Sequence, residues 1–310
     1  MRTMILSATK SRLMLPWTQL PMQRNMIFSD AFLNIDILKE KRAEKRDRIS
    51  EPGQLIRAAH KDFNANGIRN MLMNDIYRML DDAENDEDLL LVINILKTFL
   101  KSDNIISPDF STIVTTTLGS CLVLNSVKAA NELWHDPELC QFLLGTSSHL
   151  RYMMLLYNNG HYVSLAQLAK ENMRGVTVHH WTVILAALYK IGTRGAFELA
   201  KNSFCVQHLG EVDIQVTQNR AVFLYAMLAY RMGELAHAYS VLNDPRGRPH
   251  YMRLNIQLQV LIDMGRFEDA LLLVRNYISI WFVHNLEFDL VSHLTSNFEK
   301  HVLQRKTTSW

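Results

Sequence analysis

The sequence contains few residues that interrupt or crosslink a chain: its 310 residues include 12 glycines, 7 prolines and 3 cysteines. Scarce Gly and Pro beside many Leu, Ala and Met favour helices over sheets. The cysteines, Cys121, Cys140 and Cys205, form no CxxC pair and have no zinc-ligand spacing. They indicate reduced, packed side chains. No apolar run approaches the about 20 residues that span a bilayer, so we predict no membrane span.

Sequence motifs of catalysis are missing as well. The chain has no glycine-rich nucleotide loop, no metal-binding motif and no nucleophile elbow. Its 12 histidines, among them His179 and His180, have no partners at ligand spacing. We therefore predict that the protein is not an enzyme and needs no cofactor and no metal.

Acidic residues are absent from the first 29 positions, which carry the basic residues Arg2, Lys10, Arg12 and Arg24. This composition is typical of a mitochondrial presequence, and two of the basic residues interrupt the apolar core that a secretory signal needs. We expect a presequence over residues 1–26, removed near residues 25–27, and a mature protein in the mitochondrial matrix. A disordered basic tail is the alternative.

A charged extension, residues 27–60, follows this segment. Within it, LKEKRAEKRDRIS (residues 38–50) alternates Glu40 and Glu44 with Lys and Arg. Such i,i+4 pairs are typical of a solvated helix. Contact with phosphates is an alternative, but a charge run of mixed sign is usually an exposed face, and we interpret it as one.

A recurring unit occupies most of the remaining chain. An apolar helix ends at a turn residue, and a second helix follows; the turn residues are Asn125, Gly160, Gly192, Gly233 and Gly265. Successive turns are 35, 32, 41 and 32 residues apart. Gly or Asn accepts the positive φ that closes a helix. Small residues such as Ala166, Ala238 and Ala270 are expected to let the second helix pack closely on the first.

Helices joined by such short turns must be antiparallel, and stacking the next pair covers the face that each leaves apolar. We therefore predict an all-α solenoid of stacked antiparallel helix–turn–helix repeats over residues 61–285. It includes an earlier pair at roughly 66–101, and a C-terminal helix and tail, 286–310, follow it. A regular helical bundle is the alternative, but it would not explain the recurring turn.

The segment NIQLQVLIDMGRFEDALLLVRNY, residues 255–277, resembles the pentatricopeptide repeat, with Asn, an apolar helix, Gly, a polar stretch and then Ala-Leu. This resemblance implies a protein that binds mitochondrial RNA (mRNA precursors), without DNA specificity, and acts in transcript maturation, processing or stability. Other mitochondrial RNA-processing proteins are possible partners. Tetratricopeptide repeats share this pattern and bind proteins. The alternative is therefore a protein–protein scaffold, such as a mitochondrial ribosome or respiratory-complex assembly factor. The near-neutral mature chain favours it, since removal of four of the 33 basic residues leaves 29 against 31 acidic ones.

In the pentatricopeptide family one base is read per repeat, mainly by the residue ten positions before the turn glycine. Carried over, this recognition position falls on Thr115, Thr182 and Asn255, but on the apolar Leu150 and Phe223 in the other two copies. A contiguous code is therefore not expected, and capping or filling a helix start is the alternative for the two threonines.

The segment PRGRPHYMR contributes the basic residues Arg246, Arg248 and Arg253 just before Asn255. We predict that their guanidinium groups hold phosphates while Asn255 meets a base. An ordinary exposed loop is the alternative.

Overall fold

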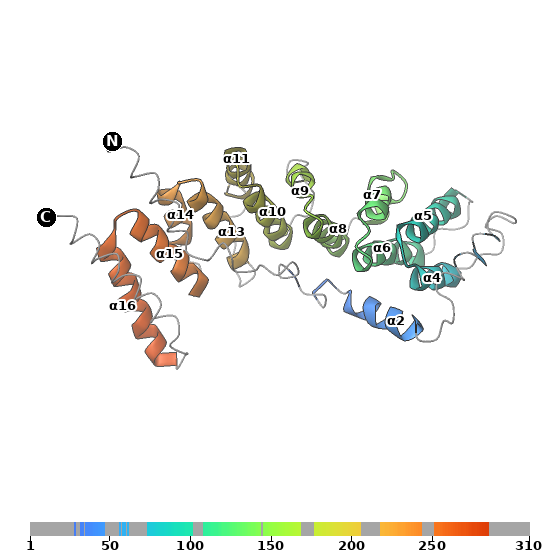
Figure 1. Ribbon diagram of the computed structural model, residues 1–310, viewed down its shortest axis with the longest axis horizontal. Helices are drawn as coiled ribbons and strands as arrows, with labels where there is room; N and C mark the ends of the chain where they lie inside the picture. The colour runs from blue at the N-terminus through green and yellow to red at the C-terminus, as the bar shows by residue number, and fades with distance from the viewer. Residues whose placement is uncertain are drawn as a thin grey trace, which may run out of the picture. The chain divides into compact units, whose positions relative to one another are not determined.

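All regular structure in the described part of the chain is helical, and these residues include no strand (Figure 1). The computed structural model describes residues 28, 32–33, 35–46, 56, 58–59, 61, 73–101, 108–143, 145–168, 177–205, 218–243 and 251–284. The predicted all-α class is confirmed. The predicted presequence, 1–26, and the C-terminal segment, 286–310, lie outside the described residues.

The chain divides into two compact units, Met1–Met232 and Gly233–Trp310. The first holds α2 (Asp36–Arg46), α4 (Met73–Asp82), α5 (Asp86–Lys101), α6 (Pro108–Val123), α7 (Val127–His135), the 3-10 turn η3 (Cys140–Leu143), α8 (Thr146–Asn158), α9 (Tyr162–Leu168), α10 (Val178–Ile191), α11 (Arg194–Ala200), the π turn η4 (Lys201–Cys205) and α13 (Gln218–Arg231). The second holds α14 (Leu235–Leu242), α15 (Tyr251–Asp263) and α16 (Phe267–His284).

All five predicted turn residues have positive φ: Asn125 (59°), Gly160 (77°), Gly192 (61°), Gly233 (80°) and Gly265 (75°). Three of these turns close the preceding helix with a pair of backbone hydrogen bonds. At Asn125, for example, the Ser126 N–H donates to the Cys121 carbonyl at 2.8 Å and the Asn125 N–H to the Leu122 carbonyl at 3.3 Å. This is the Schellman arrangement. The turn prediction is confirmed.

The residue five positions after each turn is at most 1% exposed: Ala130, Leu165, Phe197, Ala238 and Ala270. The expectation that Ala166 makes the close packing contact is wrong. Ala166 is half-buried, because the inward position of α9 is taken by Leu165, one residue earlier on the helix. The inward position therefore accepts large side chains as well as alanine.

In the first unit, alternate helices contact one another: α4 contacts α6, α6 contacts α8, α8 contacts α10, and α10 contacts α13. We call these five the first helices. Four of them are packed by the helix that follows in the chain: α5 packs on α4, α7 on α6, α9 on α8, and α11 on α10. Figure 1 shows these pairs following one another in chain order.

In the second unit, α15 packs against both α14 and α16. Its buried core consists of Leu254, Leu258 and Leu261 of α15 with Ala270 of α16. The three leucines lie at the 4- and 3-residue spacing of one helix face, so this core follows directly from the amphipathic pattern.

Candidate nucleic-acid interface

The two predicted threonine recognition positions of the first unit have hydroxyl groups that bond within their own helices. Thr182, on α10, is 2% exposed and its Oγ1 donates to the Val178 carbonyl at 2.9 Å. Thr115, on α6, is half-buried and its Oγ1 donates to the Thr112 carbonyl at 2.9 Å. The prediction that Thr182 reads a base does not fit this contact, because its hydroxyl proton is already donated within α10 and its side chain is packed in the core.

The apolar recognition positions are buried as well. Leu150 of α8 and Phe223 of α13 are each 4% exposed. Because α8 contacts both α6 and α10, Leu150 belongs to the helix between the two threonines. The first unit therefore presents no row of polar side chains at this offset.

Asn255 differs from these four recognition positions because it has polar atoms without a partner in the described part of the chain. It lies near the start of α15 and is 8% exposed, and neither its Oδ1 nor its Nδ2 has a hydrogen-bond partner among the described residues. A buried primary amide without partners costs about 1–3 kcal/mol relative to a paired one. The side chain therefore has unused hydrogen-bonding capacity of both signs, but both amide atoms are buried, so a base edge reaches them only when neighbouring side chains move aside.

The basic residues predicted beside Asn255 are only partly described. Arg246 and Arg248 lie outside the described residues. The Arg253 Nε donates to the Leu242 carbonyl at the end of α14, and the Gln257 Nε2 donates to the same oxygen at 2.8 Å. Arg253 therefore caps a neighbouring helix, and this contact restrains its guanidinium.

The first unit carries a contact surface that the sequence did not indicate. Phe28, Phe32, Leu33 and residues 35–46, here called the N-terminal strap, lie against the first helices. Phe28 and Phe32 stack on each other with ring centroids 4.6 Å apart, and both meet the ring of His179 on α10 edge-on, at 5.5 and 4.8 Å. The carbonyl of Leu33 accepts a 2.9 Å hydrogen bond from Arg151 Nε on α8.

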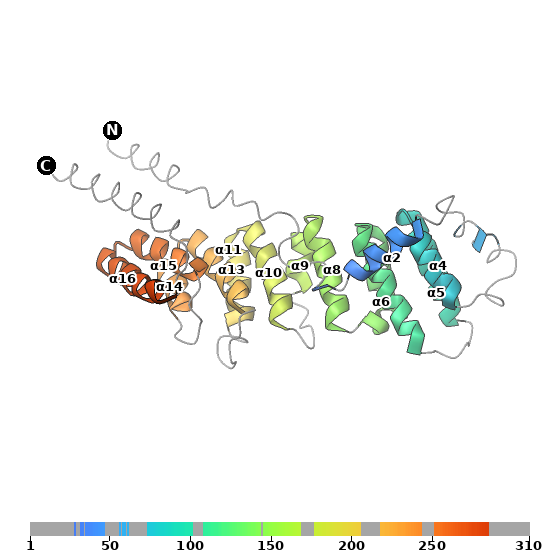
Figure 2. The same cartoon turned by 90° about the horizontal axis from the view of Figure 1, so that it is seen from below.

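Further along the strap, α2 lies against α6 and α4, and Figure 2 shows it crossing the first of these. Leu38 sits so close to Gly119 of α6 that a Cβ on that glycine would lie 2.6 Å from Leu38 Cδ1. Arg42, only 6% exposed, donates from Nη1 to the Leu80 carbonyl at 2.7 Å and from Nη2 to the Ala83 carbonyl, at the end of α4.

Glu40 and Glu44 are exposed, as the interpretation of residues 38–50 as a solvated helix expects, but Leu38 and Arg42 of the same run lie against the first helices. The positions that approach the first helices are Ile35, Leu38 and Arg42, spaced by three and four residues and therefore on one side of a helix. The apolar members of this pattern were visible in the sequence. Arg42 was hidden, because an arginine in a charge run is usually exposed, and its backbone carbonyl acceptors have no sequence signature.

Three histidines lie together beneath the strap. The rings of His149 and His180 are 5.8 Å apart, and His179 is adjacent in α10. Burial lowers the pKa of each, and for His180 burial together with His149 and His179 lowers it to about 4. The Thr177 N–H donates to His180 Nδ1 at 3.0 Å. This cluster is neutral at pH 7 and packs as apolar rings.

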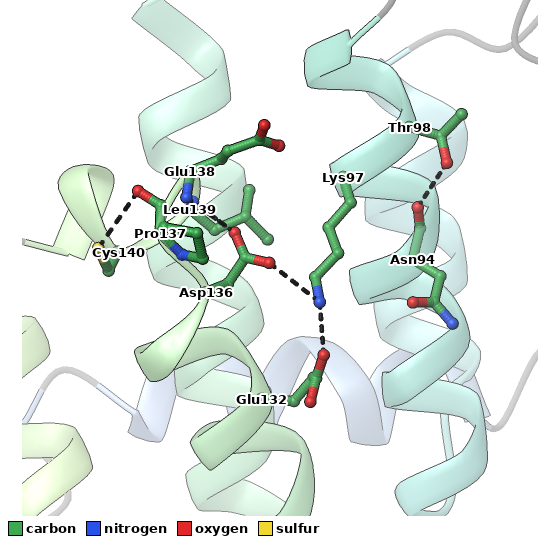
Figure 3. A network of polar contacts seen from close by, with 9 residues as sticks. All are labelled: Asn94, Lys97, Thr98, Glu132, Asp136, Pro137, Glu138, Leu139 and Cys140. Atoms are coloured by element: carbon green, nitrogen blue, oxygen red, sulfur yellow. Dashed lines mark hydrogen bonds and ion pairs between the residues drawn. The ribbon is translucent and has the colours of Figure 1, made fainter.

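A second polar cluster joins α5 to the end of α7 (Figure 3). Lys97 Nζ lies 2.5 Å from Glu132 Oε1 and 3.0 Å from Asp136 Oδ2. Asp136 Oδ1 accepts from the backbone N–H of Glu138 at 3.0 Å and of Leu139 at 2.9 Å. Burial acts to raise the pKa of Asp136, but the N–H of Leu139 and Lys97 outweigh it and lower that pKa. These contacts hold the chain after α7 in place.

Searches of the described residues find no group of three or more His, Cys, Asp or Glu side chains placed to hold a metal ion. Within the same residues, no helix combines the length and the apolar character that crossing a membrane requires. Cys121 and Cys140 are free thiols, and burial raises the pKa of Cys121 to about 12.

Comparisons with protein-family models, curated proteins and solved structures find no significant match to this chain. An assignment of function must therefore be argued from the repeat pattern of the sequence and from the contacts described above.

Proposed function

We propose that this protein is a mitochondrial RNA-binding protein built from a solenoid of helical repeats, acting in transcript maturation or stability. Two features support the solenoid. Each of the five turn residues has positive φ, and in the first unit every first helix contacts the next one in chain order. That pattern of nearest-neighbour contacts is what stacked repeats produce.

The observation that carries RNA binding is Asn255. It occupies the recognition position of the copy that most resembles the pentatricopeptide repeat, and its amide is buried without a partner among the described residues. Natural proteins rarely leave such groups unpaired, and each exception needs an explanation. A base edge that donates one hydrogen bond and accepts another fits the resemblance, provided that the side chains covering the amide move aside when RNA binds.

A second candidate is a protein-binding scaffold, and the first unit favours it. Its recognition positions are buried or bonded within their helices, and its first helices already hold a peptide segment, the N-terminal strap. A surface that accepts a folded peptide of its own chain has the chemistry of a protein-binding surface.

RNA binding is tested by fluorescence anisotropy on the purified chain with a pool of labelled single-stranded RNAs. Asn255→Leu should remove a preference among bases worth about 1–3 kcal/mol at one position. The same change should raise the free energy of unfolding by up to about 1 kcal/mol, because an unpaired buried amide is replaced by an apolar group of similar size.

The matched control is Gln259→Leu, four residues along the same helix, where the amide Nε2 bonds Asp263 at 3.2 Å instead of being unpaired. It should leave base preference unchanged. Arg246→Gln with Arg248→Gln should weaken all RNAs alike and flatten the salt dependence. If the parent chain binds none of the RNAs at low salt, RNA binding is wrong and the scaffold is the better proposal.

A further inference from the structure

The N-terminal strap contacts four first helices in an order opposite to that of the chain. Its first residues, Phe28 and Phe32, meet α10, and Leu33 is held by α8. Leu38 then lies on Gly119 of α6, and Arg42 lies on the end of α4. A segment that runs along successive repeats in this way follows the path that an extended ligand of a repeat array would take.

The contacts are those of a bound peptide. Phe28, Leu33 and one side of α2 provide apolar burial, with Phe28 only 8% and Leu33 only 4% exposed, whereas Phe32 is 43% exposed. Hydrogen bonds between the strap and the helices are few. Arg151 of α8 donates to a backbone carbonyl of the strap, and Arg42 of the strap donates to two carbonyls at the end of α4. The opposite side of α2 is exposed, including Ile37, Lys39 and Lys41.

The strap also meets one of the predicted recognition positions. Arg151 Nε donates to Leu33, while Nη1 of the same guanidinium donates to the carbonyl of Thr115 at 3.2 Å. A single side chain therefore links the strap to the α6 recognition position.

We propose that the N-terminal strap is an intramolecular ligand of the first-helix face, and that it excludes any other ligand from this face until it leaves. The face is thus a peptide-binding surface for an aromatic pair followed by an amphipathic helix with Ile, Leu and Arg on one side. Competition with RNA on this face rests on the proposed function; occupation of the face by the strap does not.

The central test uses two adjacent substitutions in the full chain. Leu38→Asp places a charge against Gly119, whereas Ile37→Asp makes the same change at a side chain that is 54% exposed. Hydrogen exchange of amides 35–46 should become faster in Leu38→Asp only. Equal exchange in Leu38→Asp and in the parent would overturn the proposal.

A labelled synthetic peptide of residues 28–46 provides a test that is independent of RNA. A tethered segment competes as if present at about millimolar concentration, so the parent and Ile37→Asp should bind the peptide at least about tenfold more weakly than Leu38→Asp does. If all three proteins bind it alike, or if none binds it, the face is not a site for this segment.

A second variant approaches the same contact from the helix beneath, in case Leu38→Asp fails to fold. Gly119→Ala places a methyl group 2.6 Å from Leu38 Cδ1, and should also speed exchange of amides 35–46. Adding Leu38→Ala makes room for that methyl group and should restore slow exchange. Failure of this restoration would contradict the contact.

RNA affinity separates competition from occupation. If Leu38→Asp binds RNA at least about tenfold more tightly than the parent and Ile37→Asp does not, strap and RNA compete for this face. Equal RNA affinities with a positive peptide result would overturn the competition. If none of the proteins binds RNA, the proposed function fails, while the peptide and exchange results still decide whether the strap occupies the face.

Discussion

Arginine side chains of this protein donate to backbone carbonyl groups at helix ends. Arg42 does so at the end of α4, Arg231 at Tyr189 of α10 (2.9 Å), and Arg253 at Leu242 of α14. A cation near a helix carboxyl end satisfies carbonyls that have no partner within the helix and interacts favourably with the helix dipole. Nitrogen atoms bonded in this way are not available to phosphates, so an electrostatic RNA surface must be built from other basic residues.

Gly192 tests the cost of a side chain at a turn with positive φ. Its φ is 61°, and a Cβ there would lie 2.5 Å from the Arg231 guanidinium that caps α10. Gly192→Ala should lower the free energy of unfolding by about 1–3 kcal/mol, from left-handed backbone strain and from displacement of this cap. Urea unfolding followed by circular dichroism measures this difference.

Two other glycines separate the cost of backbone strain from the cost of displacing the Arg231 cap. Gly160 has the same backbone sign, φ 77°, but open space around it, so Gly160→Ala should show the backbone cost alone. Gly195 lies within α11, also in open space, and Gly195→Ala should leave stability unchanged or raise it slightly. A loss at Gly195 as large as that at Gly192 would contradict this assignment.

His180 makes stability depend on pH. Its pKa is lowered from 6.5 to about 4 by burial and by the two neighbouring histidines. Between pH 6.5 and 4 the unfolded chain therefore binds a proton at His180 that the folded chain does not bind. The free energy of unfolding is highest above about pH 6.5 and decreases as pH falls towards 4. At pH 5 this loss is about 2 kcal/mol relative to pH 7.

His180→Gln removes this titration while keeping a side chain that accepts from the Thr177 N–H in a capping box. The variant should lose less stability than the parent between pH 7 and pH 5 in urea unfolding. His161→Gln, at an exposed histidine, is the control and should keep the pH dependence of the parent. Identical pH profiles for His180→Gln and the parent would show that His180 is not the group responsible.

At the scale of elements, Lys97 and Asp136 hold α5 against the chain that follows α7 (Figure 3). Their side chains are only 20% and 11% exposed, so solvent screens the pair less than a surface pair. Asp136→Asn should lower the free energy of unfolding by about 1–2 kcal/mol at pH 7, since a charge-assisted contact is lost.

The sign of the pH effect follows from the lowered pKa of Asp136. Its contribution is present above the unfolded pKa of about 3.9 and is lost as pH falls through the lower folded value. The difference between parent and Asp136→Asn should therefore shrink when urea unfolding is repeated in stronger acid. Glu132→Gln is the control, because a 50% exposed carboxylate should contribute at most about 1 kcal/mol.

For the whole molecule, the acid-free first 29 residues predict mitochondrial import. Residues 1–40 fused to a fluorescent protein should direct it to mitochondria, because basic amphipathic segments without acidic residues are typical of presequences. Replacing Arg2, Lys10, Arg12 and Arg24 by Gln in the same fusion should leave the fluorescence in the cytosol. Diffuse cytosolic fluorescence from the unchanged fusion would exclude mitochondrial targeting by this segment.

The candidate recognition positions are divided between the two units. Thr115 and Thr182 belong to the first unit, whereas Asn255 and Arg253 belong to the second. The first unit carries the strap, and the second carries the amide without a partner. The base contact proposed at Asn255 therefore lies in a different unit from the strap, whereas competition between strap and RNA concerns the first-helix face of the first unit alone.

The helical class and the five turns follow from local features of the sequence. Gly and Asn adopt positive φ at little cost, so the turn is a property of one residue and its immediate neighbours and is independent of the rest of the fold. The spacing of apolar residues, which is also a local feature, places the leucines of α15 on one buried side. These parts of the fold could be predicted because their physical causes lie within a few residues.

The strap that covers the first helices and the burial of individual polar side chains depend instead on long-range packing. Arg42 and Arg151 bond to backbone carbonyls, a group that every residue carries, so no sequence pattern could identify their acceptors. Thr182 and Asn255 both lie ten positions before a turn glycine. The Thr182 hydroxyl donates to the backbone of its own helix, whereas the Asn255 amide has no partner among the described residues. Burial depends on contacts between residues far apart in the chain, and the separation of 118 positions between Leu33 and Arg151 shows why local patterns missed the strap.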